Sequence, residues 1–160
     1  MTEPSGHYAT RAIHGETWTA REVTGGYVLC VHTGNELVAA VTEFVTSQGI
    51  AGGSIQGIGA VARATLRFRD PVDLSYIDRE FDEQMEIVAL QGNISLKADA
   101  DPHEPLVHLH ITLGRDDYTA LAGHLKETWV NGACELTIHT TEPLYKSMDD
   151  SLGLNIYSLG

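Results

Sequence analysis

The sequence predicts an α+β fold in which a mainly antiparallel β-sheet is flanked by one principal helix. Strand-like segments dominate, and the cleanest runs from Val107 to Leu113, where apolar residues alternate with polar ones. This is the period of a strand with one buried face. Helical spacing of apolar residues is clearest from Leu37 to Val45. Strands that follow one another through short turns favour antiparallel pairing, because parallel neighbours need long crossover connections.

Length and composition indicate one globular domain. The chain has 160 residues, of which 42% are hydrophobic and 20% charged, so it can bury a core and is too apolar for a disordered chain. Residues 1–16 are polar and aperiodic. We therefore predict a flexible N-terminal arm over residues 1–16 and a single domain over residues 17–160.

The first half of the predicted domain contains two strands, then the helix, then two more strands. Residues 18–23 and 27–33 are rich in β-forming residues and are separated by two glycines. We expect Asn35 to cap the helix and Gly49 to follow its end. The glycine-rich residues 52–61 and residues 64–68 resemble two strands. No helical pattern follows Gly57 and Gly59, so this pair is a weak phosphate-loop signal.

The second half contains a short polar strand over residues 75–81 and the longest strand-like run, residues 84–97. An acidic turn over residues 99–105 leads into the histidine-bearing strand. A later strand is expected over residues 134–141, followed by a tail that ends in an apolar run.

Histidines on the 107–113 strand are the strongest functional signal. His108 and His110 are two residues apart, so their side chains project from the same strand face. His124 follows a polar turn, and we expect a loop to deliver it to the same place. Three neutral imidazoles can hold zinc and leave a coordination position open for water or a ligand. The alternative is that all three are ordinary surface or interface histidines.

Two carboxylates are candidates to assist such a site. Glu86 and Glu135 lie on strands expected near the histidine strand. Either could orient a ligating imidazole or act as a general base, although an exposed strand carboxylate is the simpler interpretation of each. Glu86 is the better candidate, and no catalytic residue is identified.

Charge and cysteine content limit the other functional classes. Acidic residues number 22 and basic residues 10, giving a formal net charge of −12, which argues against direct nucleic-acid binding through phosphate contacts. Cys30 and Cys134 lie among apolar or β-forming neighbours, and we expect both to be buried and reduced. The N-terminus lacks the apolar core of a signal peptide, and no apolar run reaches membrane-spanning length, so a cytoplasmic protein without membrane contact is expected.

Six segments, in order, resemble the "plants and prokaryotes conserved" (PPC) domain, also known as DUF296, over roughly residues 24–158. They are YVLCVHTGNELVAAVTEF, SIQGIGAV, MEIVALQGNIS, VHLHITL, AGHL and CELTI. The resemblance implies an antiparallel sheet with a flanking helix, assembly as a homotrimer, and a zinc site at His108, His110 and His124. In plants this domain accompanies AT-hook motifs in DNA-binding proteins, which is the origin of the label "putative DNA-binding protein" for prokaryotic members.

The chain departs from the family pattern in places that bear on function. Ala122 replaces the first glycine of the usual Gly-Gly-His, and Lys146 stands where an arginine is common, which would weaken any bidentate anion contact there. No AT-hook sequence occurs. Three hypotheses follow: a homotrimeric zinc-binding domain with an open site for a small anionic ligand or substrate, a DNA-associated regulatory protein, and a protein-interaction scaffold with a structural metal. The sequence decides neither whether the domain is an enzyme nor which ligand it takes.

Overall fold

A computed structural model describes residues 11–100 and 104–159 and confirms the α+β prediction. Within these residues a ten-stranded, mostly antiparallel sheet is flanked by one helix, α1 (Leu37–Ser47). The strands are β1 (Ile13–His14), β2 (Trp18–Val23), β3 (Gly26–Val31), β4 (Gly53–Arg69), β5 (Tyr76–Phe81), β6 (Met85–Lys97), β7 (Pro105–Gly114), β8 (Ala120–Thr140), β9 (Tyr145–Asp149) and β10 (Leu154–Tyr157).

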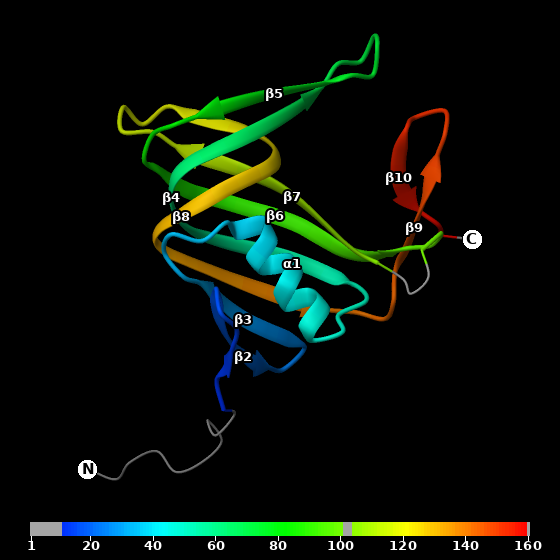
Figure 1. The fold of residues 1–160 in the computed structure, drawn as a ribbon, viewed down its shortest axis with the longest axis horizontal. Coiled ribbons are helices and arrows are strands. Elements are labelled where there is room, and N and C mark those ends of the chain that lie inside the picture. The colour runs from blue at the N-terminus through cyan, green and yellow to red at the C-terminus, as the bar shows by residue number, and fades with distance from the viewer. Residues whose placement is uncertain (1–10, 101–103, 160) are drawn as a thin grey trace.

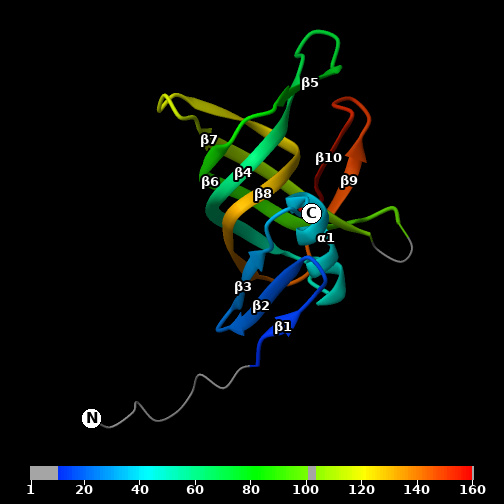
Figure 2. The same cartoon turned by 60° about the vertical axis from the view of Figure 1, so that its left-hand side comes forward.

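The centre of the sheet curls on itself. Strand β4 pairs with β6 and β8, and β7 pairs with the same two strands, so these four strands close a ring of antiparallel ladders. Strands β1, β2 and β3 extend the sheet from β8 (Figure 1). The β4–β5 hairpin projects from one end of the molecule, and β9 and β10 form a hairpin at its side (Figure 2). A short parallel pairing of β9 with β6 joins this hairpin to the sheet.

Helix α1 covers one face of the sheet and supplies much of the core. Leu37, Val41, Phe44 and Val45 are fully buried, as their 3.6-residue spacing predicts. The Phe44 ring lies edge-on to Trp18, with ring centroids 4.9 Å apart.

The N-cap of the helix lies one residue later than predicted. Glu36, not Asn35, is the N-cap, and its carboxylate accepts hydrogen bonds from the backbone N–H groups of Val38 and Ala39. The same carboxylate accepts from the Thr128 N–H of β8 at 3.0 Å, a long-range contact that a local cap preference does not anticipate. Gly49 follows the helix end with φ of 63°, as predicted.

Strands β4 and β8 are longer than the sequence pattern indicated. The two strands expected over residues 52–68 form the single strand β4, and the strand expected at residue 134 begins at Ala120. Strands β4 and β8 pair along most of their length, with register shifts near Gly59 and Val61 that let them curve. These irregularities interrupt the alternation of buried residues, so the sequence pattern predicts shorter strands than the structure has.

Other predictions concern the terminus, the cysteines and membrane contact. Residues 1–10 of the predicted arm lie outside the described residues, and Ile13–His14 pair with β2.

Cys134 is buried, which raises the pKa of its thiol to about 12, whereas Cys30 is exposed, so the expectation of burial was wrong for Cys30. Its side chain points to the face of β3 opposite the buried Leu29 and Val31. The helix found in the described ranges is too short to cross a membrane.

Candidate metal centre

The site is built on the outward face of β7. Leu109, Ile111 and Leu113 point into the core and are at most 2% exposed, so strand alternation directs His108 and His110 to the opposite face. The predicted alternation is correct, and it makes the two imidazoles neighbours, with ring centroids 5.1 Å apart.

Strand β8 brings in the third histidine. His124 is the direct register partner of His110 in the β7–β8 ladder. The expected loop delivery was wrong, because the chain turns over residues 115–119 and re-enters the sheet at Ala120. A strand fixes the imidazole more firmly than a loop would, since ladder hydrogen bonds hold its backbone on both sides.

The three side chains converge on one point. Nε2 of His108 lies 3.1 Å from Nδ1 of His124, and one nitrogen from each of the three rings falls within 4.8 Å of the others. Two nitrogens bound to one tetrahedral zinc at about 2.0–2.1 Å are roughly 3.3 Å apart. The donor set therefore fits a zinc ion, and the His108–His124 spacing is close to that of two bound ligands.

The environment of the cluster favours the neutral form of His108 and His124. Partial burial is the main cause that lowers the pKa of His108 to about 4, and the positive charges of His124, Lys146 and His110 lower it further. Burial also lowers the pKa of His124, followed by the charges of His110 and Arg67. A neutral ring keeps a nitrogen lone pair free, which is the form that binds a metal.

A buried lysine lies beside the cluster. Lys146 of β9 is only 5% exposed, and its Nζ donates to Oδ1 of Asn93 at 2.7 Å. Asn93 is the register partner of His108 in the β6–β7 ladder. The Nζ also lies 4.6 Å from the centre of the Tyr157 ring. Burial lowers the pKa of Lys146.

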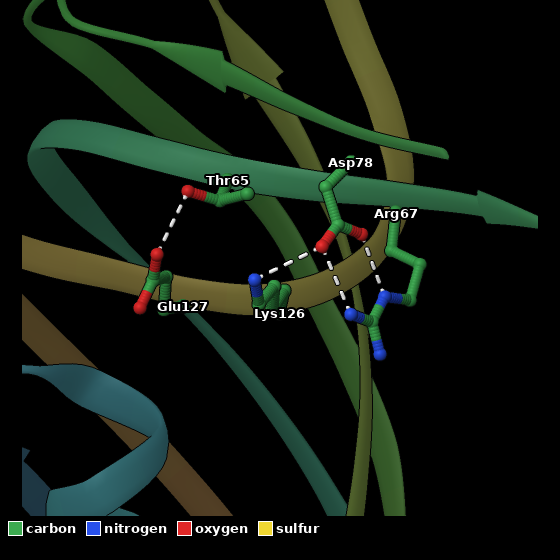
Figure 3. A network of polar contacts seen from close by, with 5 residues as sticks. All are labelled: Thr65, Arg67, Asp78, Lys126 and Glu127. Atoms are coloured by element: carbon green, nitrogen blue, oxygen red, sulfur yellow. Dashed lines mark hydrogen bonds and ion pairs between the residues drawn. The ribbon is translucent and has the colours of Figure 1, made fainter. Parts of the chain in front are cut away.

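On the other side of His124 lies a paired charge cluster, which we call the Asp78 cluster (Arg67, Asp78 and Lys126; Figure 3). Arg67 is the β4 register partner of His124, and its guanidinium makes a bidentate pair with Asp78, with N–O distances of 2.7 and 2.9 Å. Lys126 reaches the same carboxylate at 2.9 Å. Both cations hold the pKa of Asp78 well below its usual range.

The two predicted carboxylates lie elsewhere. Glu86 pairs with Gly114, four residues along β7 from His110, which is about 13 Å at strand spacing. Glu135 lies on β8 opposite Cys30 and Ile58 and lines a surface hollow of about 590 Å³. The structure thus brings the three histidines together and leaves both glutamates outside the cluster.

Sequence reasoning missed the polar residues that surround the histidines. Asn93, Lys146 and Arg67 come from three different strands, and their proximity depends on sheet register. The available signal was a lysine, Lys146, in an alternating strand pattern near the apolar C-terminal run.

Comparison with known proteins gives the family. The sequence profile of the Plants and Prokaryotes Conserved (PCC, also written PPC) domain matches residues 19–142. The chain belongs to this family. The resemblance seen in the sequence is therefore confirmed.

Solved structures of similar proteins share this PPC fold. A protein from Bacteroides thetaiotaomicron, described as a "putative DNA binding protein", is 40% identical, with a TM-score of 0.85, and the match covers 89% of this chain and 98% of that one. A "metal-containing protein" from Archaeoglobus fulgidus is 28% identical, with a TM-score of 0.74, over 96% of this chain and all of that one. A PPC protein from Pyrococcus horikoshii is 24% identical, with a TM-score of 0.76, over 92% and 99% of the two chains. A search of curated proteins gave no match.

Proposed function

We propose that this PPC domain binds a zinc ion through His108, His110 and His124 and keeps a coordination position open for a small anionic ligand. The observation that carries the proposal is the convergence of three ligand nitrogens within 4.8 Å on one sheet face. The similarity to a metal-containing protein from Archaeoglobus fulgidus supports it.

The donor chemistry favours zinc over harder cations. Three imidazoles suit zinc, whereas magnesium and calcium prefer oxygen ligands. With three protein ligands, a zinc ion would act as a Lewis acid at its fourth position. The chain's own contribution is to hold the three rings on paired strands and to favour the neutral form of His108 and His124 through burial.

Metal content tests this function. Protein purified without a histidine tag should contain about one zinc ion per protomer, and the His108→Ala/His110→Ala double variant should contain none. The matched control is His32→Ala/His139→Ala, which removes two exposed histidines that lie outside the cluster. Wild-type protein that takes up no metal even when zinc is offered would refute the proposal.

The same variants separate an open site from a structural metal. A double variant that loses zinc but keeps its fold and assembly would support an open ligand-binding site. Loss of fold or assembly together with the metal would favour the scaffold function instead.

We also propose that the protein is a homotrimer. Val28, Ile58 and Val88 are 40–58% exposed and line the same outward hollow as Glu135, and exposed apolar patches of this kind mark protein interfaces. Light scattering should report a trimer for the wild type and a smaller species for Ile58→Asp. A wild-type monomer would refute this part of the proposal.

The second candidate is a DNA-associated regulator, which the description of the Bacteroides thetaiotaomicron relative favours. Electrostatic DNA binding is strongest at low salt, so a duplex should shift in a gel under those conditions and be released as salt rises. If no shift is seen at low salt, direct binding is refuted. The net charge of −12 leads us to expect this negative result.

A further inference from the structure

Lys146 is unusual among the charged side chains because it is buried without a carboxylate partner. Within the described residues, the ion pairs join Arg67, Lys97, Arg115 and Lys126 to carboxylates, and Lys146 forms none. Its ammonium has three donors, and the polar contact found for it is the one to Asn93 Oδ1. A buried cation that lacks an opposite charge is costly unless a ligand supplies that charge.

A second buried polar group, the hydroxyl of Ser95, lies on the same strand as Asn93 and has no hydrogen-bond partner of its own among the residues described. Ser95 is 0% exposed. Because Ile94 points into the core, Ser95 shares the outward face of β6 with Asn93. Lys146 is the register partner of Lys97, two residues beyond Ser95, and its Nζ reaches Asn93, two residues before Ser95, so the lysine side chain runs along the strand face that carries Ser95. A bound polar molecule is one explanation of an unsatisfied buried hydroxyl at such a place.

The position of Lys146 and Ser95 relative to the histidines indicates the kind of ligand. Asn93, which holds Lys146, is the register partner of His108. A zinc ion on the imidazoles would add two positive charges next to the lysine, and an anion bound nearby would relieve their mutual repulsion. The Asp78 carboxylate does not fill this need, because Arg67 and Lys126 already occupy it.

We infer that Lys146 and Ser95 form an anion subsite beside the metal centre, which takes one carboxylate group of a small organic acid. A carboxylate suits a single ammonium and a single hydroxyl, whereas a phosphate dianion usually recruits an arginine fork or several backbone N–H groups. The inference deepens the proposed function, since it names the chemical class of the ligand and the residues that select it.

The first test uses metal-free protein and acetate. Replacing chloride by acetate at constant ionic strength should raise the melting temperature of the wild type by a few degrees, because a ligand that binds only the folded state stabilises it. The Lys146→Gln variant keeps a hydrogen-bond donor for Asn93 but loses the charge, so it should lose this response, and Lys146→Arg should retain it. The matched control is Lys97→Gln, which removes the same charge from a more exposed, ion-paired lysine directly opposite on β6.

A second variant guards against a folding defect in Lys146→Gln. Ser95→Ala removes a hydroxyl that no protein group in the described chain contacts, so it should fold and show a weakened acetate response. A wild type without any acetate response, or an equal response in Lys146→Gln and wild type, would overturn the inference. An unaltered response in Ser95→Ala together with an unfolded Lys146→Gln would overturn it as well.

The second test uses cobalt(II)-loaded protein, because cobalt absorbs visible light and zinc does not. Acetate titration should change the wild-type spectrum, and Lys146→Gln should bind acetate about tenfold more weakly, as expected for loss of a charged hydrogen bond. Inorganic phosphate is the comparison anion and should bind more weakly than acetate. A wild type that binds no metal would refute the proposed function, while the metal-free experiment would still decide whether the anion subsite exists.

Discussion

The two polar regions on either side of His124 differ in how their charges are satisfied. In the Asp78 cluster, two partly exposed cations share one carboxylate, and the guanidinium of Arg67 is matched by both oxygens of Asp78 (Figure 3). Around His108, the imidazoles of His108 and His124 share one hydrogen bond. The buried ammonium of Lys146 donates to the amide oxygen of Asn93, where a carboxylate would be the usual partner.

This difference indicates which of the two regions can bind a ligand. Groups that satisfy one another at the surface contribute little to stability and offer nothing to a ligand. Groups that are half-buried and incompletely satisfied raise the free energy of the folded protein, and a metal or an anion recovers that free energy on binding. The proposed ligand binding therefore belongs to the His108 side of His124, and the Asp78 side is expected to have a structural role.

The largest expected effect is the response to metal removal. A chelator should lower the melting temperature of the zinc-loaded wild type by roughly 8–16 °C, because a ligand at a thousand times its Kd stabilises the folded state by about 4 kcal/mol. Differential scanning calorimetry measures this shift, and His124→Ala should not respond. An equal shift in His124→Ala would place the metal outside the three-histidine cluster.

An intermediate effect is expected from acid on the metal-free protein. The pKa of His108 is about 4 in the folded state and about 6.5 when unfolded, so the unfolded chain binds more protons between these values. Stability must then fall as pH falls from 6.5 towards 4. Because His108 is only half-buried, the loss should be on the order of 1 kcal/mol, or ~2–4 °C in melting temperature.

The control for this pH effect is His108→Asn, which keeps a polar side chain and removes the titration. Its melting temperature should fall less steeply than that of the wild type over the same range. Carboxylates titrate in both proteins, so the difference between the two slopes isolates His108. Parallel slopes would contradict the assignment.

The smallest effect is expected from Asp78→Asn. The substitution breaks two ion pairs that are exposed to solvent and screened by salt, so the melting temperature should change less than in the acid experiment. Elemental analysis should still find about one zinc ion per protomer. Loss of the metal in this variant would show that the Asp78 cluster supports the site, and the contrast drawn between the two regions would fail.

Local patterns predicted the parts of the fold that depend on neighbouring residues. The alternation from Val107 to Leu113 placed His108 and His110 on one face, and helical spacing located α1. The same reasoning failed for the helix cap, because Glu36 is also held by the Thr128 N–H across the sheet. It failed for β8, because register shifts hide the period of a curved strand.

The sequence alone determined the sheet-and-helix class and the presence of three histidines with metal-ligand chemistry, because periodicity and residue type are local properties. Only the tertiary structure decided that His124 lies on a strand beside His110 and that Lys146 is buried next to Asn93 and His108. Those neighbours are separated in sequence and meet through ladder register, and a shift of one residue in register would turn their side chains to the opposite face.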